Sequence, residues 1–140
     1  VKLPVIAAGG IADATGVAAA LALGASAVQA GTAYLLCNET NTSQIHRAAI
    51  KSEASRHTAL TNVFSGRPAR SIVNRIMREV GPISQNTSAF PLAATAISAL
   101  KKPAEVTGSG DFSSLWCGQN ATGCEEISAA DMTRALAAKI

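Results

Sequence analysis

The chain opens with two short apolar runs separated by a stretch rich in helix-forming residues. Leu3 to Ala8 is the first run, and Ser26 to Gly31 is the second. Continuous apolar runs of this length are typical of strands buried on both faces of a sheet. Ala14 to Leu23, between them, is rich in alanine and leucine and predicts a helix. The order strand, helix, strand predicts a βαβ unit with parallel strands and a right-handed crossover.

Capping residues and glycines mark the boundaries of this predicted unit. Asp13 is a candidate N-cap of the helix, and Gly24 fits its C-terminal cap. Gly9 and Gly10 end the first strand, and Gly31 ends the second. Because the carboxyl ends of parallel strands meet at the ligand-binding edge of a sheet, we expect these glycines to lie together.

The rest of the chain has a less regular pattern. Four further helices are predicted, at Ser43 to Ser52, Arg67 to Val80, Leu92 to Leu100 and Ala129 to Lys139. Pro68 would open the second of these and Gly81 would close it. The third would stop before Pro103, and Ser128 would cap the fourth. The change of pattern near residue 40 predicts a domain boundary between residues 1–40 and 41–140.

Composition favours a soluble globular protein. The 140 residues are 48% hydrophobic and 15% charged, with a net charge of +3. The basic residues do not form the stripe that nucleic-acid binding needs, and no apolar run is long enough to span a membrane. Three cysteines without a CxxC pair indicate neither a disulfide framework nor a metal site, which favours a cytoplasmic location. The oligomeric state is left open.

The two glycine turns are candidates for binding a phosphate group. Backbone N–H groups at such turns attract anions, and (β/α)8 barrels often bind phosphate at the loops after their last two strands. Thr32, directly after Gly31, offers an amide and a hydroxyl group. A plain turn at Gly9–Gly10 and a packing role for Gly31 are the structural alternative. Two such turns, one βα unit apart, favour the phosphate site.

These motifs carry a resemblance to a known family. The stretch "PVIAAGGIADATGVAAALALGASAVQAGTAYLL" resembles the C-terminal part of FMN-binding (β/α)8 barrels, a group that includes inosine monophosphate dehydrogenase and flavin-dependent enoyl-ACP reductase. "LTNVFSGRPARSIVNRIM", "PLAATAISAL" and "SSLWCGQNA" are similar to segments of the nitronate monooxygenase (2-nitropropane dioxygenase) family.

The resemblance implies a fold class and a cofactor. The fold is α/β: the C-terminal part of an FMN-binding (β/α)8 TIM barrel plus a smaller, mostly helical second domain. Residues 1–40 would be the last βα units of the barrel, and residues 41–140 mainly the second domain, with the terminal helix returning to the barrel. The FMN-binding residues would be Gly9, Gly10, Gln29, Ala30, Gly31 and Thr32.

The implied activity is the flavin-dependent oxidation of alkyl nitronates by O2 to a carbonyl compound and nitrite. The family's catalytic histidine lies in a Gly-Gly-His context, which neither His46 nor His57 has. We therefore assign no catalytic residue here. We expect the chain to be an inactive C-terminal fragment of a longer oxidoreductase, because it begins without Met, just before a strand.

Two other functions remain open at this point. One is an FMN-dependent enoyl-ACP reductase or NADH:quinone reductase on the same barrel, and the other is a non-catalytic domain that binds a phosphate ligand. Arg67, Arg70 and Gln119 are further candidates for ligand contacts. For the arginines a structural role is favoured over anion binding, and for Trp116 a place in the core is favoured.

Overall fold

The computed structural model describes residues 2–140, which form two compact units. Unit 1 combines the chain up to Thr42 with Gly118–Ile140, and unit 2 is Ser43–Cys117. Each unit has its own hydrophobic core. Unit 1 is therefore built from two segments that lie far apart in the sequence.

Unit 1 contains the βαβ arrangement that the apolar pattern predicts. Strand β1 (Ile6–Ala8) is followed by helix α1 (Ala14–Ala22) and strand β2 (Ala27–Gln29). The two strands pair in parallel, with Ile6 opposite Ala27 and Ala8 opposite Gln29. The predicted parallel unit is confirmed, although its strands are shorter than the apolar runs.

Both predicted caps of α1 are present. The Asp13 carboxylate accepts a hydrogen bond from the Gly16 N–H at 2.7 Å, which satisfies one of the exposed donors of the first turn. Gly24 follows the last residues of the helix with φ +99°, the left-handed conformation that glycine adopts at helix ends.

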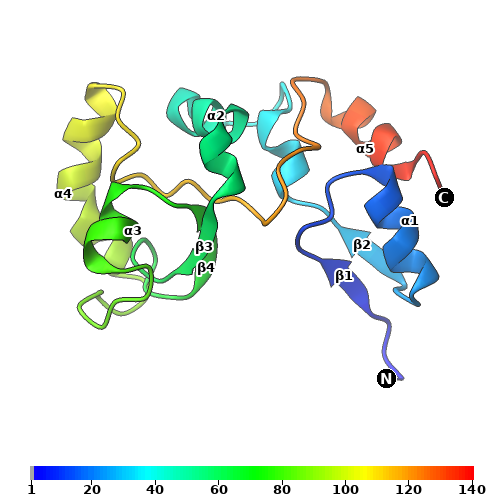
Figure 1. Cartoon of the computed structure of the whole chain (residues 1–140), viewed down its shortest axis with the longest axis horizontal. Helices are drawn as coiled ribbons and strands as arrows, with labels where there is room; N and C mark the ends of the chain where they lie inside the picture. Colours follow the sequence, from blue (N-terminus) through cyan, green and yellow to red (C-terminus); the bar gives the residue numbers. More distant parts are fainter. Residues whose placement is uncertain (1) are drawn as a thin grey trace. The chain divides into compact units, whose positions relative to one another are not determined.

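The core of unit 1 joins its two sequence segments. A 3₁₀ helix, η1 (Thr32–Leu36), follows β2, and helix α5 (Ala129–Ala137) begins at Ser128, whose hydroxyl accepts a hydrogen bond from the Asp131 N–H. Helices α1 and α5 pack side by side (Figure 1). The buried core residues are Val17, Ala33, Cys37, Met132 and Leu136.

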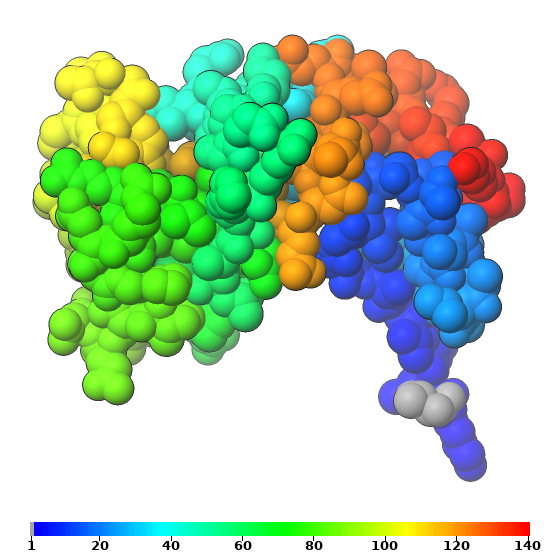
Figure 2. Space-filling view, viewed as in Figure 1, coloured from blue at the N-terminus to red at the C-terminus, as the bar shows by residue number. Residues whose placement is uncertain are grey.

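The two strands are exposed, which corrects the prediction that they are buried on both faces. Ile6 is 60% exposed and Val5 is 47% exposed. The sheet of unit 1 has only two strands within residues 2–140, so no barrel closes around it. Figure 2 shows the residues that precede β1, in blue, extending away from α1. The faces of parallel strands become buried only where other elements pack against them.

Unit 2 begins with helix α2 (Gln44–Lys51), as predicted, capped by the Ser43 hydroxyl. The 3₁₀ helix η2 (Glu53–Arg56) leads into strand β3 (Thr58–Thr61). β3 pairs antiparallel with β4 (Ala69–Ile72), a hairpin that the sequence did not predict.

The predicted helix from Arg67 to Val80 is wrong in its first half. Pro68 precedes strand β4, and only α3 (Arg75–Val80) is helical, ending at Gly81 with φ +82°. Because proline has no N–H, it is tolerated at the beginning of a strand, where it removes no hydrogen bond between the strands. The strand also buries Ser71 and Ile72, so tertiary burial outweighs the local helix signal.

Helix α4 (Ala93–Val106) continues through Pro103, where the sequence predicted it to stop. Pro103 lacks the N–H that would bond the carbonyl of Ala99 four residues earlier. Both residues are exposed, so water can hydrate that carbonyl. No helix among the described residues is both long and apolar enough to cross a membrane.

An asparagine and a tryptophan contribute to the core of unit 2, the first by hydrogen bonds and the second by packing. Val63, Phe64, Met77 and Ile97 form the buried cluster, and the Trp116 ring meets Phe64 edge-on with the ring centres 5.7 Å apart. The buried Asn74 side chain donates from Nδ2 to the carbonyls of Gly110 and Ser113, at 2.8 and 2.9 Å. This amide ties the start of α3 to the loop after α4.

We predict that Asn74→Asp destabilises unit 2 by about 3 kcal/mol, because a carboxylate oxygen would replace the donor that faces two carbonyl oxygens. The measurement is urea unfolding followed by the fluorescence of Trp116, the only tryptophan and a residue of unit 2. Asn86→Asp is the matched control, because Asn86 is exposed and the charge change is the same. Equal stability of the two variants would contradict the structural role of Asn74.

Candidate phosphate-binding site

A cavity of about 330 Å³ lies at the carboxyl edge of β1 and β2, within unit 1. Five of the six residues predicted from the sequence line it: Gly9, Gly10, Gln29, Gly31 and Thr32. Parallel pairing brings the two glycine turns together, as the pattern of strands predicted. The cavity falls within the size range of small-molecule sites, ~300–1,000 Å³.

Ala30 is the exception among the predicted residues. It lines a different cavity of about 530 Å³, together with Val17, Val28 and Leu136. Gln29 lines both cavities, whereas Ala30 lines only the second. A contribution of Ala30 to the first cavity is limited to its main chain.

The Gly9–Gly10 turn has a backbone that favours glycine and leaves open space beside it. The φ angles of Gly9 and Gly10 are +92° and +73°, in the left-handed region. A Cβ built on either residue would meet no atom within 4 Å. The glycines therefore serve the backbone conformation, and the neighbouring space remains available to a ligand.

The donors at this cavity are neutral. The backbone N–H groups of Gly10 and Thr32 have no hydrogen-bond partner within residues 2–140. The Thr32 hydroxyl oxygen accepts a hydrogen bond from the Gly118 N–H at 2.8 Å, which leaves the hydroxyl proton available for donation. No charged side chain lines this cavity, so attraction of an anion would come from backbone dipoles and the hydroxyl group.

Four lining residues were not in the predicted set: Ala8 and Ile11, which flank the glycine pair, and the distant Gly118 and Asn120. The last two are the ones that sequence reasoning missed as a segment. They lie in "LWCGQN", where the sequence pointed to Gln119. Gln119 is exposed and does not line the cavity. The glycine at 118 was the available signal, but a contact over 86 residues cannot be inferred from local pattern.

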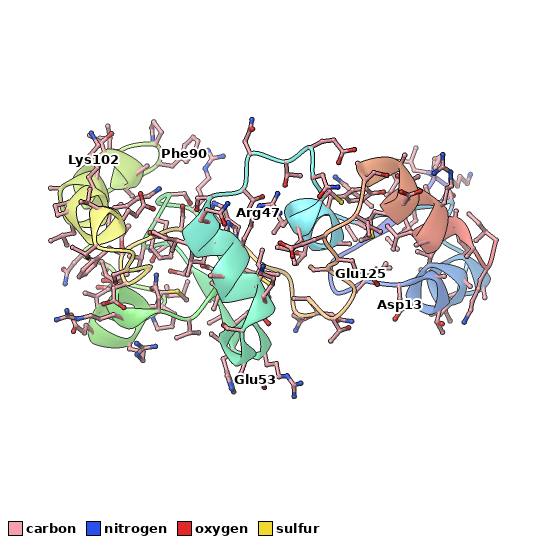
Figure 3. All side chains as sticks on the ribbon, turned by 90° about the horizontal axis from the view of Figure 1, so that it is seen from above. Asp13, Arg47, Glu53, Phe90, Lys102 and Glu125 are labelled. Carbon is pink, nitrogen blue, oxygen red and sulfur yellow. The ribbon has the colours of Figure 1, made fainter. Side chains whose placement is uncertain are left out.

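The start of α1 does not contribute to the cavity. Asp13 and Ala14 line a separate small cavity with Glu125, and both carboxylate residues are labelled in Figure 3. The Asp13 side chain caps this helix end. The N-terminus of α1 therefore lies outside the candidate site, whereas the start of η1, at Gly31 and Thr32, lines it.

The two candidate arginines have partners inside unit 2. The Arg67 guanidinium lies 4.3 Å from the centre of the Phe90 ring, which is labelled in Figure 3. Arg70 donates to the carbonyl and the hydroxyl oxygen of Thr58 at 3.2 and 3.3 Å. These contacts agree with the structural role favoured for both residues.

Burial shifts the pKa values of one histidine and one cysteine of unit 2. His46 Nε2 lies 2.9 Å from the Trp116 carbonyl oxygen, and burial lowers the pKa of His46 despite this hydrogen bond. Burial raises the pKa of the Cys117 thiol. The described part of the chain contains no cluster of three or more His, Cys, Asp or Glu side chains that could hold a metal ion.

A parallel βαβ unit with glycine turns and unsatisfied amides at its carboxyl edge is the kind of site that α/β proteins use for phosphate ligands. The profile of the family "Nitronate monooxygenase" matches residues 1–139. The chain belongs to this family.

The sequence relatives agree with this assignment. The chain is 43% identical over 136 residues to a nitronate monooxygenase of Pseudomonas aeruginosa and 42% identical to one of Paraburkholderia phytofirmans. The alignments cover 96% of this chain but only 39% and 37% of those proteins. The chain thus spans about two fifths of the length of these relatives.

Two solved structures are also similar. Nitroalkane oxidase from Streptomyces ansochromogenes matches 99% of this chain and 40% of its own, with a TM-score of 0.88 and 40% identity. FabK from Thermotoga maritima matches with a TM-score of 0.71 and 31% identity, over 99% of this chain and 44% of its own.

The lowered pKa of His46 predicts a pH-dependent loss of stability. Unfolded His46 takes up a proton near its ordinary pKa of 6.5, whereas the folded state resists protonation, so its contribution to stability is lost as the pH falls. We expect His46→Gln, which keeps a neutral donor for the Trp116 carbonyl, to lose less stability between about pH 7 and pH 5. Urea unfolding at each pH measures this.

His57→Gln is the control for this experiment, because His57 is exposed and its side chain lies outside the Trp116 contact. It should keep the pH dependence of the unchanged chain. If His57→Gln, and not His46→Gln, flattened the stability profile, the assignment of the pH dependence to the half-buried His46 would be wrong.

Proposed function

We propose that the protein carrying this chain is an FMN-dependent nitronate monooxygenase that oxidises alkyl nitronates with O2 to a carbonyl compound and nitrite. Family membership and the relatives' names support this activity. Because the chain spans about two fifths of those relatives, the activity is proposed for the longer protein. The chain alone is proposed to be inactive.

The observation that carries the proposal is the glycine-lined cavity. A phosphate group fits the open space beside Gly9 and Gly10, and the N–H groups of Gly10 and Thr32 together with the Thr32 hydroxyl would donate to its oxygens. Gln29 and Gly31 complete the wall, with Ala30 contributing main chain only.

The flavin, when bound, would supply the redox chemistry of the reaction. The residues of this chain would anchor the phosphate end of the cofactor and fix its position. Proton abstraction from a nitroalkane is not assigned to this chain, because His46 is engaged with Trp116 and His57 lacks the glycine context.

The division into two units supports a separate structural role for each unit in the longer protein. Residues 1–40 would form the last βα units of a (β/α)8 barrel, with α5 returning to them, and residues 41–117 would form most of a second domain. The exposed strands of unit 1 are where further barrel strands would pair. We also propose a cytoplasmic location for the longer protein.

Two alternative functions predict different reactions in the full-length protein. An enoyl-ACP or NADH:quinone reductase would oxidise NADH without turning over nitronates, and a non-catalytic phosphate-binding domain would do neither. The lower identity and TM-score of the FabK match favour the monooxygenase. Nitrite release from an alkyl nitronate under air, compared with NADH consumption, separates the three in the full-length protein.

We predict that Gly10→Val in the full-length protein abolishes FMN retention, because the side chain strains a left-handed backbone and fills the space beside it. Flavin absorbance after gel filtration measures retention.

Gly24→Val is the matched control: Gly24 also has a left-handed φ and open surroundings, but it lies outside the cavity. It should lose stability without losing flavin. Retention of flavin by a folded Gly10→Val protein would contradict the proposed site.

A further inference from the structure

The return segment, Gly118–Cys124, leads from unit 2 back into unit 1 and passes along the loops that follow β1 and β2. Figure 1 shows it in orange beside the loop after β1. A Cβ at Gly123 would overlap the carbonyl group of Ala12, so the two backbones are in direct contact there. The return segment therefore packs against the loop after β1, which contains Gly9 and Gly10.

The return segment is also fastened to the loop after β2. The Gly118 N–H donates to Thr32 Oγ1 at 2.8 Å, and the Cys124 thiol donates to the Thr32 carbonyl oxygen at 3.1 Å. A Cβ at Gly118 would lie 3.2 Å from Thr32 Oγ1. These two hydrogen bonds to Thr32 hold both ends of the return segment.

Asn120 lies between these two attachments and lines the cavity. Its Oδ1 accepts hydrogen bonds from the Thr122 N–H and the Thr122 hydroxyl, at 3.0 and 2.7 Å. Both bonds use the oxygen, so the orientation of the amide is fixed and the Nδ2 group keeps its two protons. No hydrogen bond from Nδ2 is found within residues 2–140.

We propose that the return segment is the third wall of the phosphate site and that Asn120 Nδ2 donates a hydrogen bond to the bound phosphate ester. This inference rests on the proposed function, because it assumes that the phosphate end of FMN occupies the cavity. Asn120 would be the only side-chain amide of the return segment facing the ligand, since Gln119 is exposed and lies outside the cavity lining. Thr32 would be both a ligand donor and the residue that positions the segment.

The test uses Asn120→Asp in the full-length protein. An aspartate keeps the oxygen that Thr122 bonds, removes the Nδ2 donor and places a negative charge beside the phosphate. We expect the Kd for FMN to rise by about 10-fold or more, the loss typical of one hydrogen bond to a charged group. The Kd for riboflavin, which lacks the phosphate, should not change.

Gln119→Glu is the matched control, with the same change of charge one residue away at an exposed position, where solvent screens it. It should bind FMN as the unchanged protein does. Flavin fluorescence titration gives each Kd, and circular dichroism verifies folding.

The outcomes separate the two claims. If the unchanged protein bound FMN no better than riboflavin, the proposed phosphate site itself would fail. If it preferred FMN and Asn120→Asp kept that preference in full, the site would stand and the role of Asn120 would be wrong. Equal losses from Gln119→Glu and Asn120→Asp would also overturn the specific contact.

Slower amide hydrogen exchange in the return segment on FMN binding, and not on riboflavin binding, is expected if the phosphate completes this wall. Unchanged exchange with bound FMN would contradict the proposed contact.

Discussion

The parallel pairing of β1 with β2 is the constraint on which the candidate site depends. Two parallel strands joined by a helix must end at the same edge, so the turns that follow them become neighbours. The pairing of Ala8 with Gln29 places Gly9 one residue and Gly31 two residues beyond the last pair. The caps of α1 and its packing against α5 hold the crossover in place, so the turns inherit their geometry from the whole unit.

No charged side chain within residues 2–140 lines the cavity at this edge. Its candidate donors are the N–H groups of Gly10 and Thr32 and the Thr32 hydroxyl, whose oxygen also accepts the hydrogen bond from Gly118. Arg67, Arg70 and the half-buried His46 make their contacts within unit 2, through ring stacking and hydrogen bonds to carbonyls.

Local pattern predicts the parts of this molecule that local forces determine. The βαβ order, the Asp13 and Ser128 caps and the glycine turns follow from short stretches of sequence, and the structure confirms them. The predictions at Pro68 and Pro103 were wrong. The residues after Pro68 pair as a strand instead of forming a helix, and α4 continues through Pro103, where its exposed surroundings allow it. Gly118 and Asn120 reach the cavity through contacts over many tens of residues, which no local pattern encodes.

The split composition of unit 1 has a consequence for how the polypeptide is made. During synthesis, α1 and η1 leave the ribosome long before α5 exists, and all of unit 2 is produced in between. Until then Val17, Ala33 and Cys37 lack the residues that cover them, Met132 and Leu136. The nascent chain must therefore keep this apolar face shielded, or transiently bound to a chaperone, until α5 emerges.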